Sequence, residues 1–254
     1  MELKPHEYFY AGYLSAIAGI YFEEIQIYSF AKSYENKEPS ASKVTAVLED
    51  RLNAHGQTTA NNMAYVNHLY EQLGFGKLEI PKRLSEYSKW QNTNFNKTRE
   101  SLENMGLNAY LLAYGSYLGT LEKCSTILLS TVYLPVATDG AIWPPSGIIA
   151  KSLDALKEYE EHIAVTTKVL MTEEGFDFVE PLAKTINEQI QAVLAIGVPE
   201  GGPMIGTKDP KQLFDVTNTA VAELTEVAKT LSLQLETKYS DKPNNDRDLG
   251  IIGG

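Results

Sequence analysis

Residues 104–134 read NMGLNAYLLAYGSYLGTLEKCSTILLSTVYL, and only Glu122 and Lys123 among them carry a charge. The low charge continues as far as Ala150, with Asp139 the one further charged residue. No proline interrupts the stretch before Pro135, so a helix over about 98–134 contains no residue that would break it. A helix that is apolar on most of its circumference must be surrounded by other helices or by lipid. We therefore predict a central, nearly all-apolar helix.

The same stretch carries two glycines four residues apart, Gly115 and Gly119. Small residues at this spacing let two helix backbones approach closely. The apolar run near the N-terminus has a matching set, so we predict a tight contact between these two helices. Its small residues are Ala11, Ser15 and Gly19, and the tyrosines expected along the seam are Tyr110, Tyr114 and Tyr117.

Insertion of residues 104–150 into a membrane is the alternative for so apolar a stretch, and it would make the protein amphitropic. We favour packing within the protein, because Pro135, Pro144 and Pro145 leave no clean membrane-spanning segment beyond the Glu122–Lys123 pair. The acidic chain also disfavours contact with anionic lipid.

The prolines divide the chain into proline-free windows, and a helix interior rarely tolerates proline. Each window repeats apolar residues every three or four positions, the spacing of an amphipathic helix. Asp209-Pro210-Lys211-Gln212 has the sequence of a helix start, and Gly175 and Gly197 are placed to end helices. We predict an all-α protein, an antiparallel bundle of about six long helices. The windows are 6–38, 40–80, 82–134, 146–180, 182–198 and 211–242.

We expect a single helical-bundle domain over residues 1–254. The alternative is two halves, 1–134 and 146–239, joined by the apolar loop 135–145. The last residues, 240–254, are rich in Asp, Asn and Gly and have the composition of an extended tail.

The composition excludes several classes of function. Twenty-two Lys and Arg against 33 Asp and Glu give a net charge of −11, whereas a nucleic-acid-binding protein needs a cationic face. The single cysteine, Cys124, leaves no internal disulfide and no cysteine-based zinc site. The first residues carry Glu2 and Glu7 beside Lys4, unlike the positive start of a secretory signal. We therefore expect a cytoplasmic protein that binds no nucleic acid.

Three segments outside the expected helices combine turn-forming residues with apolar ones. A flexible linker would be polar, and tryptophan with neighbouring apolar side chains is typical of contacts between proteins. We therefore predict that these segments bind a protein partner or another copy of the chain. The predicted contact residues are Val136, Ile142 and Trp143 in the first segment, Val198, Met204 and Ile205 in the second, and Ile251 and Ile252 in the third.

A bundle of long helices can also hold a metal ion, with inward Glu residues and Glu-x-x-His motifs. That motif is absent from the sequence, but five side chains are candidate ligands for a transition metal such as iron. Such a site would make the protein an oxidoreductase or a metal-storage protein. We favour the simpler interpretation, in which most of these groups lie on solvated helix faces. The candidate ligands are Glu24, His68, Glu71, Glu158 and His162.

No phosphate-binding loop, nucleotide-binding fingerprint or nucleophile elbow occurs in the sequence, so we assign no catalytic residue and expect no cofactor. We predict a non-catalytic helix-bundle protein that acts through protein–protein contacts, as a self-assembling structural subunit or an adaptor. A homo-oligomer or a complex with a protein partner is the expected state. The metal-binding bundle and the amphitropic protein are the two alternatives.

Overall fold

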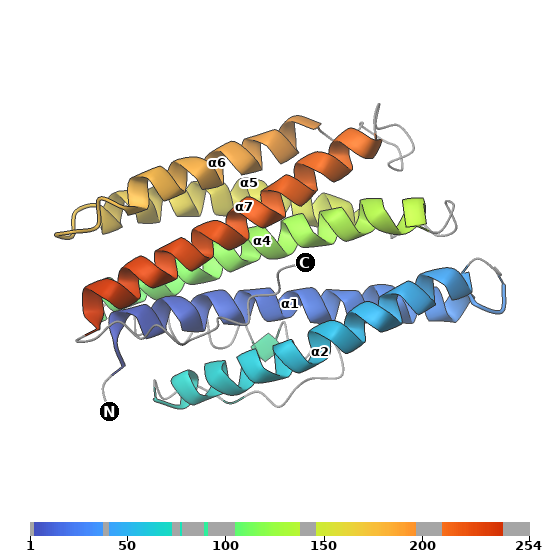
Figure 1. Ribbon diagram of the computed structural model, residues 1–254, viewed down its shortest axis with the longest axis horizontal. Coiled ribbons are helices and arrows are strands. Elements are labelled where there is room, and N and C mark those ends of the chain that lie inside the picture. Colours follow the sequence, from blue (N-terminus) through green and yellow to red (C-terminus); the bar gives the residue numbers. More distant parts are fainter. Residues whose placement is uncertain are drawn as a thin grey trace.

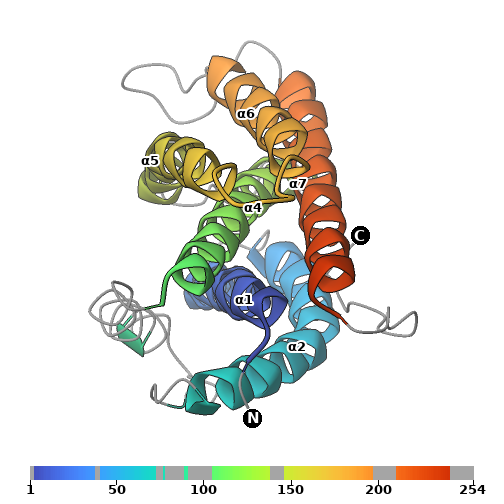
Figure 2. The ribbon, with the colours of Figure 1, turned by 90° about the vertical axis from the view of Figure 1, so that its left-hand side faces the viewer.

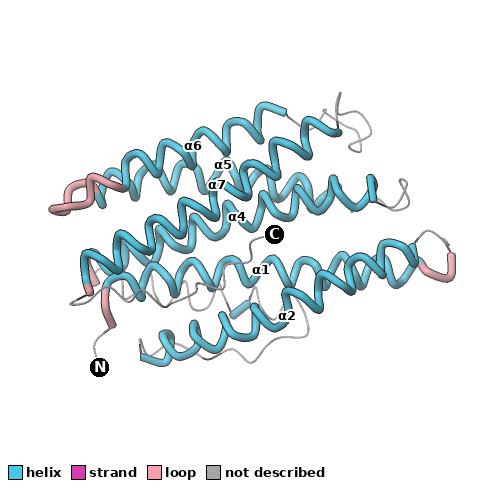
Figure 3. Tube along the Cα trace, in the orientation of Figure 1, coloured by secondary structure: helices cyan, strands magenta, loops and turns pink. Residues whose placement is uncertain are grey.

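The computed structural model describes residues 3–37, 41–72, 77, 89–90, 105–137, 146–196 and 210–240, and this part of the chain contains helices and no strand (Figures 1 and 3). Six long helices lie in it, so the predicted all-α bundle is confirmed. They are α1 (Pro5–Tyr34), α2 (Ala41–Gln72), α4 (Leu107–Ala137), α5 (Ser146–Leu170), α6 (Val179–Ile196) and α7 (Pro210–Tyr239).

The helix boundaries follow the prolines and glycines closely. Helix α1 begins at Pro5, and the Lys4 amide donates to the Glu7 carboxylate at 2.7 Å, which satisfies a donor at the helix start. Helix α7 begins at Pro210, as predicted. Gly175, with φ of 74°, lies in the turn between α5 and α6. Pro181 is the third residue of α6, in the first turn, where a backbone amide would have no partner within the helix.

Both ends of the central helix differ from the prediction of 98–134. Helix α4 begins at Leu107, because Gly106 has φ of 54°, a left-handed conformation that does not continue a helix. At its other end α4 continues through Pro135 to Ala137. Proline is tolerated there because it lies in the last turn. Its missing amide costs one backbone hydrogen bond at the helix end and does not break the helix in its interior.

Helix α4 lies at the centre of the bundle, in contact with α1, α5 and α7 (Figure 2). No residue between Leu111 and Ser130 is exposed, which confirms the predicted central helix. Helices α2, α5 and α7 run opposite to α1, α4 and α6, so helices adjacent along the chain, such as α4 and α5, are antiparallel (Figure 1). The pair α1 and α4 runs in the same direction, as the first and third helices of such an alternating bundle must.

The α1–α4 contact depends on glycine, although its register differs from the prediction. A Cβ on Gly115 would overlap the carbonyl oxygen of Phe9 and lie 2.9 Å from the Tyr13 amide nitrogen. A Cβ on Gly119 would lie 2.8 Å from the Cβ of Ala16. The facing small residues on α1 are therefore Gly12 and Ala16 rather than Ala11, Ser15 and Gly19. The two backbones touch here because no side chain separates them.

The three tyrosines predicted for this seam lie elsewhere. Tyr110 is exposed, and the Tyr114 hydroxyl oxygen accepts a hydrogen bond from the Thr167 hydroxyl of α5 at 3.3 Å. Tyr117 stacks on His162 of α5 with ring centroids 4.9 Å apart. Tyr114 and Tyr117 share one helix face, and that face is turned toward α5 while the glycines face α1.

Candidate functional site

The residues predicted to bind a partner fall almost entirely outside the part of the chain that the structure describes. Val136 lies in the last turn of α4, and its side chain is not among those described. The other seven residues lie outside the described ranges, namely Ile142, Trp143, Val198, Met204, Ile205, Ile251 and Ile252.

The five candidate metal ligands are not brought together. His68 and Glu71 are exposed on α2, where Glu71 pairs with Lys77 at 3.5 Å. Glu158 is exposed on α5, and the half-buried ring of His162 stacks on an aromatic residue of α4. Glu24 is fully buried between α1 and α2. Within the described residues, no three His, Cys, Asp or Glu side chains are grouped so as to hold a metal ion.

Glu24 instead joins α1 to α2 through two basic side chains. Its carboxylate lies 2.7 Å from the Arg51 guanidinium and 2.8 Å from His55 Nδ1. Arg51 and His55 are four residues apart on α2, so both reach the same carboxylate from one helix face. A buried carboxylate is destabilising unless it is paired in this way. Glu24 was a candidate metal ligand because the register of α2, which brings Arg51 and His55 to it, cannot be read from the sequence.

Replacing Arg51 with methionine should lower the free energy of unfolding by about 1 to 2 kcal/mol, since one charge-assisted contact to buried Glu24 is lost while His55 remains. Urea unfolding of the two proteins measures this difference. Lys184→Met is the control, because Lys184 is exposed and lies 3.8 Å from Glu188, where an ion pair contributes at most about 0.5 kcal/mol. Equal losses in the two variants would contradict a stabilising role for Arg51.

A second buried carboxylate, Glu122, links three helices at the centre of the bundle. The Tyr13 hydroxyl of α1 donates to one of its oxygens at 2.5 Å, and the Thr225 hydroxyl of α7 lies 3.0 Å from the other. The Thr225 hydroxyl also lies 2.8 Å from the Val221 carbonyl oxygen, which can only accept a hydrogen bond. One hydroxyl proton cannot serve both acceptors fully.

Protonation of Glu122 resolves this competition. The Glu122 carboxyl proton can then go to Thr225, the Thr225 proton to the Val221 carbonyl oxygen, and the Tyr13 proton to the second Glu122 oxygen. Each hydroxyl proton has its own acceptor in this arrangement. Burial raises the pKa of Glu122 to about 7, although the hydrogen bonds from Tyr13 and Thr225 lower it in part. Glu122 thus titrates near neutral pH inside the bundle.

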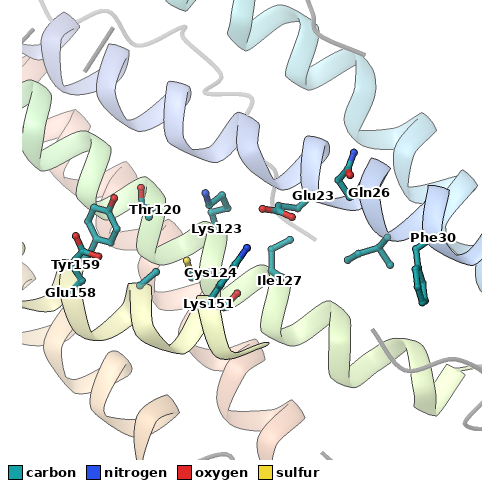
Figure 4. Close-up of a pocket in the computed structure, with 13 residues that line it drawn as sticks. Glu23, Gln26, Phe30, Thr120, Lys123, Cys124, Ile127, Lys151, Glu158 and Tyr159 are labelled. Atoms are coloured by element: carbon teal, nitrogen blue, oxygen red, sulfur yellow. The ribbon is translucent and has the colours of Figure 1, made fainter. Parts of the chain in front are cut away.

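The described surface also contains a groove, lined by residues of α1, α4 and α5, with a volume of about 560 Å³ (Figure 4). Buried side chains of α1 and α4, Ile27, Cys124 and Ile127, form its apolar floor. Charged side chains stand at its edge, with Glu23 on α1 facing Lys123 on α4 and Lys151 on α5 (Figure 4). The groove is therefore amphipathic, with an apolar base and charges of both signs above it.

Two groove residues, Cys124 and Tyr159, are protonated at neutral pH. Burial raises the pKa of the Cys124 thiol to about 11, and it raises the pKa of Tyr159 to about 12. Both groups therefore keep their protons at neutral pH, so neither supplies an anionic nucleophile. Partial burial raises the pKa of Glu23, and the positive charges of Lys123 and Lys151 lower it in part.

Sequence reasoning missed this groove because its residues come from three separate helices. Two of its residues gave a signal: Glu158 was a candidate metal ligand, and Glu23 is a charged residue within the apolar first helix. Lys123 stood out only as part of the charged pair within the apolar stretch, and nothing in the sequence distinguishes Lys151 from other helix-surface lysines.

The chain matches no protein-family model, and comparisons with curated proteins and with solved structures find no match either. Among the described helices, none combines the length and the apolar character needed to cross a bilayer.

Proposed function

We propose that this protein is a non-catalytic helix-bundle subunit that acts through protein–protein contacts, as a self-assembling structural subunit or an adaptor. The observation that carries this proposal is the position of four helix ends. The ends of α4 and α6 and the starts of α5 and α7 lie at the same end of the bundle (Figure 1). These four ends flank the two segments between Ala137 and Ser146 and between Ile196 and Pro210.

Both apolar segments are therefore joined, along the sequence, to helix ends that lie at this end of the bundle. The first segment contains Ile142 and Trp143, and the second contains Val198, Met204 and Ile205. Aromatic and apolar side chains of this kind supply most of the binding energy in protein interfaces. This arrangement supports one shared contact surface more than two unrelated ones.

The close packing of α1, α4 and α7 supports the same proposal. Gly12, Gly115 and Gly119 hold α1 against α4, and Glu122 joins both of these helices to α7. A framework that is already ordered loses little conformational entropy of its own when a partner binds at its end. The buried polar groups thus stabilise a platform from which the end segments can make contact.

The double variant Trp143→Ala/Ile142→Ala should lower the oligomeric mass of the purified protein. We expect the wild-type mass, measured by light scattering after size exclusion, to be a multiple of 28.2 kDa or to rise on addition of a binding partner. The variant should remain closer to 28.2 kDa because the contact loses its largest apolar side chains.

Tyr110→Ala provides the control, because Tyr110 is an exposed aromatic residue near the start of α4, at the opposite end of the bundle. Its removal should leave the mass unchanged. An unchanged mass in the double variant, or an equal decrease in the Tyr110 variant, would count against the proposed contact.

A further inference from the structure

The groove between α1, α4 and α5 carries an inference that is independent of the proposed assembly. Its volume of about 560 Å³ lies within the range of roughly 300 to 1,000 Å³ that is typical of small-molecule sites. Such sites combine an apolar lining with a few polar groups that fix the orientation of the ligand. The groove has this composition, since Ile27 and Ile127 form part of its floor and charged side chains stand above them.

Three of these charged side chains come from three different helices and converge on the same space. The carboxylate of Glu23 and the ammonium groups of Lys123 and Lys151 all extend into the space above the floor (Figure 4). Within the described part of the chain, Glu23 forms no ion pair with either lysine at 4.0 Å or less. The three groups are near enough to influence one another, because both lysines act electrostatically on Glu23.

A half-buried carboxylate without a direct ion partner is stabilised when a cationic group binds beside it. The two lysines would repel a ligand that carries only positive charge. Glu23 and Glu158, the second carboxylate of the lining, would repel one that carries only negative charge. Charge complementarity is therefore satisfied by a ligand with one charge of each sign. The apolar floor adds a requirement for an apolar group on the same ligand.

We propose that this groove binds a small zwitterion with an apolar side chain, of the chemical class to which free amino acids and dipeptides belong. Its ammonium group lies beside Glu23, and its carboxylate lies between Lys123 and Lys151. Its apolar side chain rests on Ile27 and Ile127.

Calorimetric titration with three related probes tests this assignment. The probes are the dipeptide leucyl-leucine, its N-acetyl derivative, which lacks the ammonium group, and its amide, which lacks the carboxylate. The wild-type protein should bind the free dipeptide at least about tenfold more tightly than either derivative, because each derivative loses one charge-assisted contact. Equal affinity for the three probes, or no binding of any of them at millimolar concentration, would overturn the proposal.

Two variants then assign the charged contacts to particular residues. Glu23→Gln should lose about tenfold in affinity for the free dipeptide and no longer distinguish it from the N-acetyl derivative. Lys151→Met should bind the free dipeptide more weakly and distinguish it less from the amide. Because Lys151 is exposed, its replacement leaves the fold intact. Lys168→Met, on the same helix but outside the groove, should bind as the wild type does. Wild-type affinity in both groove variants would overturn the assignment, whatever the oligomeric state of the protein.

Discussion

Replacing Gly115 with valine is expected to lower the free energy of unfolding by about 3 kcal/mol or more, the largest stability change that we predict. The reason is the absence of space, since even a single Cβ at this position would overlap the Phe9 carbonyl oxygen. That atom belongs to the backbone of α1 and cannot rotate away as a side chain can. The helices must therefore separate, and contacts are lost along the whole α1–α4 seam. Chemical unfolding followed by circular dichroism measures the loss.

Gly56→Ala is the matched control for this prediction. A Cβ on Gly56 of α2 would lie 3.4 Å from the hydroxyl oxygen of Tyr21, at the mobile end of a side chain. Alanine is favoured over glycine inside a helix, so this variant should be unchanged or more stable by up to about 1 kcal/mol. If Gly115→Val were as stable as Gly56→Ala, the close approach of α1 and α4 would be wrong.

The second large effect is a pH dependence of stability caused by Glu122. Its pKa is raised to about 7 in the folded protein, above the ordinary value of about 4.3 expected in the unfolded chain. A group with a raised folded-state pKa stabilises the fold fully below its unfolded pKa, and this contribution is lost as the pH rises through the folded pKa. As the pH rises from about 5 to about 8, ionisation of Glu122 should therefore lower the free energy of unfolding by about 2 to 3 kcal/mol.

Glu122→Gln isolates this contribution from those of other titrating groups. The glutamine amide reproduces the hydrogen bonds of protonated Glu122, accepting from Tyr13 and donating to Thr225, but it does not titrate. The stability difference between wild type and variant should therefore change by about 2 to 3 kcal/mol over this pH range, as measured by urea unfolding at each pH. A difference that is constant with pH would contradict the raised pKa.

Tyr13→Phe shifts the same titration in a known direction. The Tyr13 hydroxyl donates to the Glu122 carboxylate and so lowers its pKa in part. Without this donor, the pKa of Glu122 should rise further, and the loss of stability should begin at a higher pH. A midpoint that does not move would show that Tyr13 is not a hydrogen-bond donor to Glu122.

Much of the fold follows from charge and proline placement in the sequence. The low charge of residues 104–134 predicted an enclosed helix, and α4 is enclosed by α1, α5 and α7. Pro5 and Pro210 lie at helix starts because proline lacks the amide that the first turn leaves unpaired. These features act locally, through one residue and its own helix, so sequence alone indicates them.

Register between helices could not be predicted in the same way. Gly12 and Ala11 are adjacent in α1 but point about 100° apart around the helix axis. Only the packed structure shows that Gly12 faces Leu112 and Ser116 of α4.

The polar interior was the hardest part to predict, because each buried group depends on partners far away in the sequence. Glu122 lies 109 residues from Tyr13 and 103 residues from Thr225. Glu24 lies 31 residues from His55, which satisfies its charge without a metal ion. Residue type and local spacing identified Glu24 as a buried carboxylate candidate, but they left its partner open, and a metal site was one of several arrangements consistent with that spacing.

The central structural claim is that α4 is an enclosed rod around which the other helices pack. Amide hydrogen exchange on the full-length protein, read out along the chain by mass spectrometry or NMR, tests it most directly. We expect the amides between Leu111 and Ser130 to exchange more slowly than those of the other helices, and only through global unfolding. The contradicting result is equally fast exchange in this stretch and in the partly exposed helices α2 and α6, under conditions where the protein stays folded.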